Sequence, residues 1–243
     1  MLELQSLNAP KAADVLAGSL REKILSGQFD QGTALPSERE LVEQVSLSRA
    51  TVREALRILE GEGLIATRTG RNGGSAVVRP SAAAIERSVS IFIRGQRIRF
   101  DAVLEAREAI EPASARFAAQ HRTEADLQEM QACHLAMEAA SQQGDLKGYV
   151  RANLDWHVAV VRASHNELLI AFISAVSESV HEATDLDGIN PLETRNAVIH
   201  AHRRVMDAIR AADGQAAERR MTRHVSAYVG HVRAKNTDQK EIR

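Results

Sequence analysis

The sequence predicts a mainly α-helical fold, in which an N-terminal winged helix-turn-helix with a small β-hairpin precedes a C-terminal all-α bundle of about six helices. Apolar residues recur at helical spacing along most of the 243 residues. Only 14 glycines and 5 prolines are present, a composition that favours helices. Strand-like runs flank one glycine-rich turn. Because aromatic residues make up only 3%, the cores must be built from aliphatic side chains.

Three helices are expected before the strands. Apolar residues spaced through Lys11–Ser26 predict an amphipathic helix that ends at Gly27. Ser37 and Glu40 form a capping box, in which each side chain satisfies a backbone N–H, at the start of a helix over Glu38–Val45. A short polar break separates this helix from the third.

The third helix carries an exposed stripe of positive charge. Ser48 is its expected N-cap, and the helix runs to about Glu62. Arg49, Arg53 and Arg57 follow one another at i, i+4 and i+8 and therefore share one face. Two short helices joined by a tight turn, the second basic near its N-terminus, describe a helix-turn-helix, whose second helix enters the major groove of DNA.

A β-hairpin should follow, because Leu64–Thr67 and Ser75–Val78 bracket the glycine-rich run RTGRNGG, which would form the wing. The formal net charge of −1 argues against DNA binding spread over the whole surface, so affinity must come from the arginine stripe and the wing. The single Cys133 excludes an intramolecular disulfide and the usual cysteine-based zinc modules.

After the hairpin, every segment has a helical period. Ser81–Ile93 is expected to be a linking helix, and Gly95 with its neighbouring arginines a hinge. We therefore divide the chain into a DNA-binding domain over residues 9–79, a linker over 80–98 and a helical domain over 99–236. The expected helices of the last domain are Asp101–His121, Thr123–Gln142, Asp145–Ala163, Glu167–Thr184, Leu192–Ala212 and Gly214–Lys235.

The predicted bundle contains a group of polar residues that can hold a metal. Asn153 and His157 are four apart on one helix and face the same side. His202 and His224 lie on the last two helices, which a short turn makes antiparallel neighbours. Neutral imidazoles with an oxygen ligand suit Zn²⁺, Ni²⁺ or Mn²⁺. Spacing alone also allows other pairings of histidines, or a structural or exposed role for all of them.

The segment LPSERELVEQVSLSRATVREALRILEGEGLI combines the helix-turn-helix features at fixed offsets. It closely resembles the winged helix-turn-helix of GntR-type bacterial transcription regulators, whose pattern runs LPSER-x-LA, then SR-x-TVR-x-AL, then a glycine-containing wing.

The exposed start of the third helix supplies the expected DNA contacts. Arg49 and Arg53 are candidates for bidentate contacts to guanine in the major groove. Ser48 and Thr51 can hold phosphates at the helix N-terminus, aided by its dipole. The resemblance adds one position on the preceding helix and two at the wing tip: Arg39, Thr69 and Gly70.

Three further segments, VLEAREAIEPASARFAA, NLDWHVAVVRASHN and AHRRVMDAIRAAD with ERRMTRHV, follow the head in this order. They resemble the FCD ligand-binding domain of FadR-like members of the GntR family. In metal-containing members the ligands are an Asp or Asn and three His, which fall here on Asn153, His157, His202 and His224. Asn153 replaces the frequent Asp, which removes a negative charge and should weaken the site. Ala201 stands where Glu often precedes the ligand His.

The resemblance also implies a small carboxylate as the effector. A metal with an open position could bind the carboxylate, and a buried arginine could clamp it bidentately. Arg107 matches the arginine of the first FCD helix and is the candidate clamp. The alternative is an ion pair of Arg107 with Glu105, Glu108 or Glu111.

The sequence therefore predicts a ligand-responsive bacterial transcription regulator, a repressor, that binds a palindromic operator as a homodimer and senses a small organic acid. We expect a divalent metal ion, no organic cofactor, no membrane partner and no enzyme activity. No leader pattern and no stretch approaching 18 apolar residues occurs, so a cytoplasmic location is expected. The alternative is a metal-dependent enzyme built on the bundle, but no H-E-x-x-H, G-x-S-x-G or phosphate-binding glycine loop is present.

Overall fold

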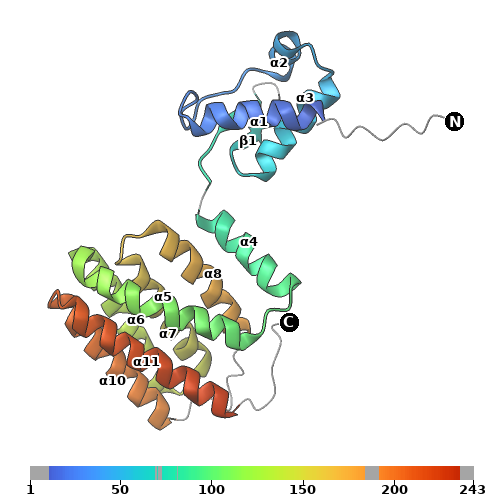
Figure 1. Ribbon diagram of the computed structural model, residues 1–243. Helices are drawn as coiled ribbons and strands as arrows, with labels where there is room; N and C mark the ends of the chain where they lie inside the picture. The colour runs from blue at the N-terminus through green and yellow to red at the C-terminus, as the bar shows by residue number, and fades with distance from the viewer. Residues whose placement is uncertain (1–10, 69, 71–72, 81, 184–191, 236–243) are drawn as a thin grey trace. The chain divides into compact units, whose positions relative to one another are not determined.

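The computed structural model describes residues 11–68, 70, 73–80, 82–183 and 192–235 (Figure 1). The chain divides into two compact units, Met1–Ala84 and Ile85–Arg243, and each has its own hydrophobic core. The division falls within the predicted linker of residues 80–98. The outer ends of the two predicted domains, residues 9 and 236, lie outside the described residues.

In its described residues up to Pro80, the first unit contains three helices and a hairpin, as predicted. In the hairpin, Ile65 pairs with Val77 and Arg68 with Gly74 in an antiparallel two-stranded sheet. The predicted strand positions differ from the observed ones by one residue. The elements are α1 (Ala12–Leu25), α2 (Glu38–Val45), α3 (Arg49–Gly61), β1 (Ile65–Arg68) and β2 (Gly74–Val77).

Side-chain caps begin both helices of the helix-turn-helix. The Ser37 N–H donates to Oε2 of Glu40 (2.7 Å), and the Glu40 N–H donates to Oγ of Ser37 (3.3 Å), which completes the predicted capping box of α2. Oγ of Ser48 accepts from the Thr51 N–H (3.1 Å) at the start of α3. These local bonds satisfy backbone donors that the first helical turn leaves without partners.

The core of the first unit fixes the face that α3 presents to solvent. Val52, Ala55 and Leu59 are fully buried and pack with residues of α1 and the hairpin, among them Leu20 and Ile65. Since one stripe of α3 is buried in this way, the arginines of the opposite stripe stay exposed.

The second unit is all-helical in its described residues (Figure 1). Helix α5 packs along α11, α6 packs along α7, and α10 lies against α11, α6 and α5. Ser81, the predicted start of the linking helix, and Thr184, the predicted end of the helix that begins at Glu167, lie outside the described residues. The elements are α4 (Ala82–Gly95), α5 (Phe100–His121), α6 (Glu124–Gln143), α7 (Leu146–Arg162), α8 (Glu167–Ala183), α10 (Leu192–Arg210) and α11 (Gly214–Lys235).

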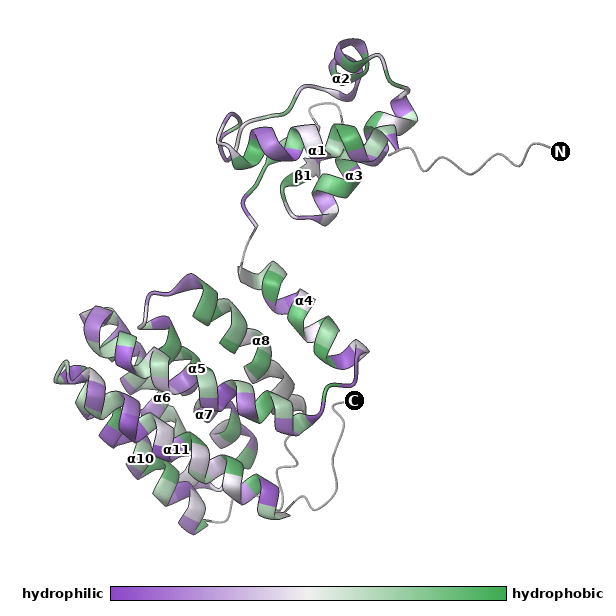
Figure 2. Cartoon of the chain, in the orientation of Figure 1, coloured by the Kyte–Doolittle hydropathy of each residue, from purple (hydrophilic) through white to green (hydrophobic). Residues whose placement is uncertain are grey.

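The bundle core is built mainly from small and aliphatic residues, and its buried aromatic side chains are Phe100, Tyr149 and the fully buried Trp156. In Figure 2, α10 and α11 alternate between hydrophobic and hydrophilic residues around the helix, whereas α8 is hydrophobic along most of its visible length. Such amphipathic helices turn their polar faces to water and one apolar stripe to the core. Within the described part of the chain, no helix is both long and apolar enough to cross a membrane.

Candidate nucleic-acid interface and metal centre

The arginines of the helix-turn-helix differ in their pairing. Arg53 on α3 forms a two-point ion pair with Glu38 on α2, Nη2 to Oε2 at 3.1 Å and Nε to Oε1 at 3.4 Å. Arg39 lies 3.0 Å from Glu43 on its own helix. Arg49 has no hydrogen-bond or ion-pair partner among the side chains that the structure describes. Arg49 can therefore contact DNA without first leaving an acidic partner, whereas Arg53 must leave Glu38.

The hydroxyls predicted to hold phosphate are both engaged at the start of α3. Oγ of Ser48 lies 2.8 Å from Oγ1 of Thr51, in addition to accepting the Thr51 N–H. The two hydroxyls share one hydrogen, so one O–H remains free to donate to a phosphate oxygen. At the wing tip, Gly70 has φ of +118°, a conformation that L side chains rarely adopt, while Thr69 lies outside the described residues.

Three histidines from three helices meet in the bundle, and all three had been selected from the sequence. His157 is on α7, His202 on α10 and His224 on α11, and each is buried. Nε2 of His224 lies 3.0 Å from Nε2 of His202 and 3.3 Å from Nε2 of His157. Imidazoles that share one Zn²⁺ at the usual Zn–N distance place their nitrogens about 2.9–3.4 Å apart. Both of these spacings fit a common ion, and the candidate ligand atoms of all three histidines lie within 4.8 Å of one another.

Hydrogen bonding alone satisfies this cluster poorly. Nδ1 of His157 lies 2.6 Å from Oε2 of Glu111, although the angle of this contact departs from that of an ideal hydrogen bond. Because a carboxylate can only accept, we assign the proton of the imidazole ring to Nδ1. Nε2 of His157 then carries a lone pair that points at the other two rings. Nε2 of His224 has at most one proton, so it cannot donate a linear hydrogen bond to both neighbours at once. Three converging imidazole nitrogens are an arrangement that a cation satisfies.

A buried carboxylate contacts the three-histidine cluster through His157. Glu111 on α5 is 0% exposed and lies between His157 and Arg107, whose Nε donates to Oε1 of Glu111 at 2.5 Å. Burial by itself would raise the pKa of Glu111, but Arg107 and His157 hold that pKa well below its ordinary value. The carboxylate is therefore charged, and it fixes the orientation of His157 as carboxylates do for metal-ligating histidines.

The surroundings keep all three imidazoles neutral. Burial lowers the pKa of His224 to about 3, and the neighbouring His157 acts in the same direction. Burial, followed by the effect of His224 and His157, puts the pKa of His202 well below its ordinary value. Burial also lowers the pKa of His157, although Glu111 opposes the shift. Because metals bind the neutral imidazole, all three residues are in the form that can act as a ligand.

A small cavity of about 30 Å³ adjoins the histidines. Asn153, the predicted oxygen ligand, lines it together with Arg107, His157 and His224. Oδ1 of Asn153 is buried and has no hydrogen-bond partner among the described residues. A buried carbonyl oxygen without a donor is costly, and a cation beside it would remove that cost. The cavity has room for an ion or a water molecule but not for an organic acid.

Two contributors to the site were missed in the sequence. The first is Glu111, which the sequence predicts only as an alternative ion-pair partner of Arg107; it is that partner, and it also contacts His157. The second is Trp156, whose ring stacks on the ring of His202 at a centroid distance of 3.5 Å and an interplanar angle of 10°. The spacing of Arg107 and Glu111 at i, i+4 was visible, but their apposition to α7 depends on the tertiary fold.

Two families of known proteins match the two units of this chain. Residues 12–74 match "Bacterial regulatory proteins, gntR family", and residues 102–227 match "FCD domain". The first match covers the helix-turn-helix and most of the wing, and the second contains all four predicted metal ligands.

Individual relatives are similar over nearly the whole chain. The Glc operon transcriptional activator of Escherichia coli K12 is 30% identical over 220 residues, which cover 87% of this chain and 85% of the relative. The galactonate operon transcriptional repressor of the same strain is 31% identical over 212 residues, 84% of this chain and 90% of the relative. The solved structure of a Streptococcus agalactiae GntR protein has the same fold, with a TM-score of 0.66 and 24% identity over 92% of this chain and 99% of that one.

Proposed function

Because the chain belongs to the gntR family of bacterial regulatory proteins and its helical unit is an FCD domain, we propose that it binds an inverted-repeat operator as a homodimer and releases it in response to a small organic acid. The family consists of transcription regulators, and no similarity supports the enzyme alternative. The sensing part of the proposal rests on one observation. In a chain that also has a helix-turn-helix, three buried histidines have Nε2 atoms that converge beside a small cavity.

The first part of the proposal concerns DNA recognition. Helix α3 enters the major groove, where Arg49 and Arg53 contact guanine edges and Ser48 and Thr51 contact phosphate. Arg39 contributes from α2, and the wing tip at Thr69 and Gly70 approaches the minor groove. Support comes from the exposure of these side chains on α2 and α3 and from the free guanidinium of Arg49.

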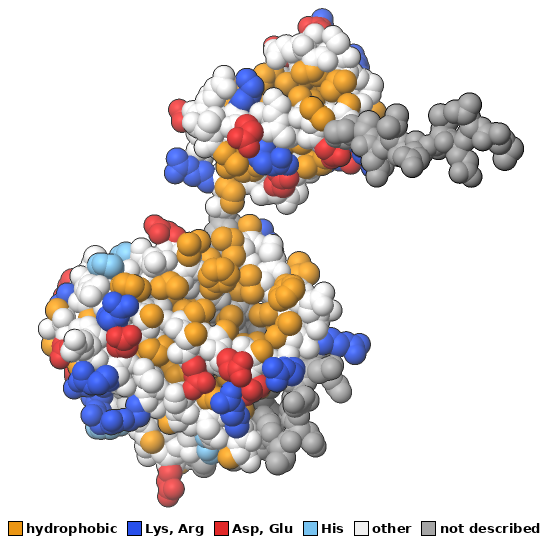
Figure 3. Space-filling model, in the orientation of Figure 1, with side chains coloured by type: hydrophobic (Ala, Val, Ile, Leu, Met, Phe, Trp, Pro, Cys, Tyr) orange, Lys and Arg blue, Asp and Glu red, His pale blue; other side chains and the backbone are white. Residues whose placement is uncertain are grey.

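The second part concerns the dimer, which a two-fold symmetric operator requires. Large apolar side chains are exposed on α4 and α8, and Figure 3 shows hydrophobic residues gathered on this face of the bundle. The two helices are neighbours, since Glu86 of α4 and Ser174 of α8 line one pocket. An exposed apolar face of this kind marks an interaction surface, and we assign it to a second copy of this chain. Its exposed apolar residues are Ile85, Ile91, Phe92, Leu168 and Phe172.

The third part concerns the metal. His157, His202 and His224 would hold a divalent cation such as Zn²⁺, Ni²⁺ or Mn²⁺, with Oδ1 of Asn153 as the oxygen ligand. When bound, such a cation supplies a Lewis-acid position for a carboxylate oxygen. Glu111 fixes the ring of His157, and Arg107 lines the cavity as the candidate carboxylate clamp while its Nε is held by Glu111.

The fourth part is the switch. The cavity of about 30 Å³ must enlarge before an organic acid can enter, so its walls on α5, α7, α10 and α11 must move. An organic acid therefore binds a bundle with an enlarged cavity more tightly than it binds the bundle in this structure. That difference in affinity is what allosteric control requires. We propose repression as the outcome in the absence of acid, because a dimer on DNA blocks a promoter without a further protein contact. A protein that binds operators acts in the cytoplasm.

The DNA assignment predicts that Arg49→Ala weakens operator binding by roughly 1–3 kcal/mol and relaxes the base preference at one position of each half-site. The operator would first be selected from random DNA, and affinity would then be measured by fluorescence anisotropy. Arg57→Ala is the matched control, since Arg57 lies farther along α3 with Glu54 3.8 Å away, and its loss should weaken all sequences equally. Unchanged affinity and preference in Arg49→Ala would show that this residue does not contact a base.

The metal assignment predicts about one equivalent of a divalent transition metal per purified chain, measured by mass spectrometry. His202→Ala should remove it. Glu111→Gln should lower metal affinity about 10- to 100-fold, because His157 loses the carboxylate that orients it. His200→Ala, an exposed histidine two residues from His202, serves as the control and should keep the metal. Equal metal content in His200→Ala and His202→Ala would contradict the assignment.

The dimer surface predicts that Phe92→Glu weakens self-association at least about tenfold in analytical ultracentrifugation, because it places a charge in an apolar interface. Leu135→Glu is the control: Leu135 on α6 is 53% exposed and Phe92 is 59% exposed, but Leu135 lies outside the α4–α8 face. If both variants dimerise as the unmodified protein does, the face is wrongly assigned.

The effector assignment predicts that one member of a panel of sugar acids, hydroxy acids and dicarboxylates raises the melting temperature and lowers operator affinity. Galactonate is the first acid to test, because a relative is named for a galactonate operon, and galactitol is its uncharged control. A reporter behind the selected operator should be derepressed by the same acid. A panel in which no acid alters operator affinity would refute the sensing half of the proposal.

A further inference from the structure

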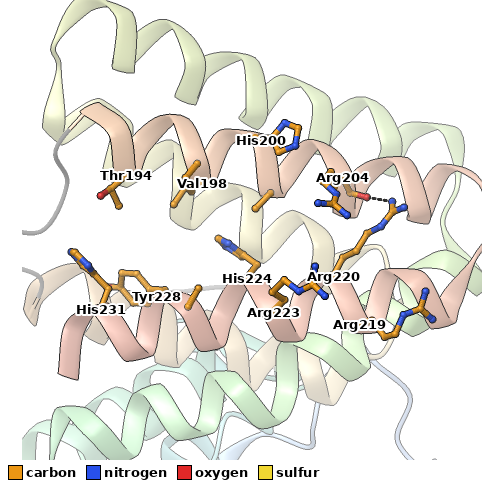
Figure 4. Close-up of a pocket in the computed structure, with 13 residues that line it drawn as sticks. Thr194, Val198, His200, Arg204, Arg219, Arg220, Arg223, His224, Tyr228 and His231 are labelled. Atoms are coloured by element: carbon orange, nitrogen blue, oxygen red, sulfur yellow. Dashed lines mark hydrogen bonds between the residues drawn. The ribbon is translucent and has the colours of Figure 1, made fainter. Parts of the chain in front are cut away.

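A second and much larger cavity lies between the last two helices of the bundle. This groove between α10 and α11 has a volume of about 620 Å³, within the range of small-molecule sites (Figure 4). Small apolar residues contribute to its lining, among them Ala201 of α10 and Ala227 of α11. Val198, His224 and Tyr228 line both this groove and the 30 Å³ cavity, so the two spaces share a wall.

Four arginines line the groove, and no acidic residue is found among the described residues of its lining. Figure 4 shows Arg204 of α10 near Arg220 and Arg223 of α11, on the same side of His224 as Arg219. Arg220 is held in place, because its Nη1 donates to the backbone carbonyl of Arg204 at 2.5 Å. In the described part of the chain, no carboxylate pairs with Arg204, Arg219 or Arg223.

Outside the groove, each arginine of α10 and α11 has a polar partner, which for Arg195 is the backbone carbonyl of Ser141. Other arginines on the same two helices have acidic partners: Arg203 with Glu138, Arg210 with Asp207 and Arg233 with Asp101. The chain has a formal net charge of −1, so four positive charges without counterions in one groove are a local concentration rather than a general excess. Such a groove attracts anions, and guanidinium groups bind phosphate and carboxylate oxygens bidentately.

We propose that the α10–α11 groove is a binding site for a small organic molecule that carries a doubly charged anionic group on an apolar body, such as a phosphate monoester or a dicarboxylate. The anionic group lies among Arg204, Arg219 and Arg223, and the apolar body covers Ala201 and Ala227. The arginines of this site do not line the three-histidine cavity, so occupancy of the groove needs neither the metal nor the operator.

The test uses the full-length protein and isothermal titration calorimetry, with phenyl phosphate and isophthalate as the two doubly charged probes. At least one should bind at about one site per chain, with a dissociation constant below about 1 mM, while uncharged phenol should not. The stronger of the two binders identifies the anionic group as phosphate or dicarboxylate. If neither probe binds, the proposal is wrong.

Two groove variants locate the site. The double variant Arg204→Gln/Arg223→Gln should weaken binding at least about tenfold, and Arg203→Gln/Arg210→Gln, which removes the same charge outside the groove, should change it less than about twofold. Ala227→Leu fills the groove without altering charge and should also weaken binding, which keeps the test valid if the double variant does not fold. Trp156 fluorescence checks folding.

The anionic probes could also bind to the arginines of the DNA-binding surface, and a third variant tests for this. Arg49→Ala/Arg57→Ala should leave probe binding unchanged. Binding that is lost in this head variant but kept in both groove variants would show that the probe mimics DNA phosphate on α3, and it would overturn the proposal.

Discussion

The candidate site depends on one buried carboxylate. Glu111 lies between Arg107 on its own helix and His157 on α7, and all three side chains are almost completely removed from water. Desolvating such charges costs several kcal/mol per ion, which only close and complete pairing offsets. The pairing joins α5 to α7, sets which nitrogen of His157 carries its proton, and so aims the Nε2 lone pair at His202 and His224. Removal of Glu111 would leave a buried guanidinium without a counterion and a histidine without an orientation.

Local rules predicted what depends on neighbours in sequence. The capping box at Ser37 formed as expected, because it needs only a hydroxyl and a carboxylate three residues apart. The three histidines also came together, because an antiparallel pair of helices places His202 opposite His224. Glu111 could not be assigned to His157 from sequence, since the two are joined only by the packing of α5 against α7. The volumes of the two cavities also could not be predicted from the sequence, because they depend on how all the surrounding side chains pack.

Contacts that depend on tertiary packing were also not predictable at the DNA-binding surface. Helical spacing correctly placed Arg49 and Arg53 on the exposed face of α3, but it could not show that Glu38 of α2 occupies the guanidinium of Arg53. That ion pair is solvent-exposed and so contributes little to stability. Its effect is on DNA recognition: Arg53 must exchange one partner for another, whereas Arg49 adds a contact without losing one. Within one arginine stripe, the two residues should therefore differ in how much binding energy they contribute.

The two cavities of the helical unit differ in volume, and therefore in the kind of ligand that each can hold. The inner one, about 30 Å³ and surrounded by histidine nitrogens and Oδ1 of Asn153, has room for an ion. The outer one, about 620 Å³ and lined by arginines, has room for an organic molecule. His224 belongs to the wall of both, and its buried ring contacts His157 and His202 on one side. A displacement of α11 relative to α10 that alters the groove must therefore also alter the three-histidine cluster, because close-packed interiors transmit such shifts instead of absorbing them.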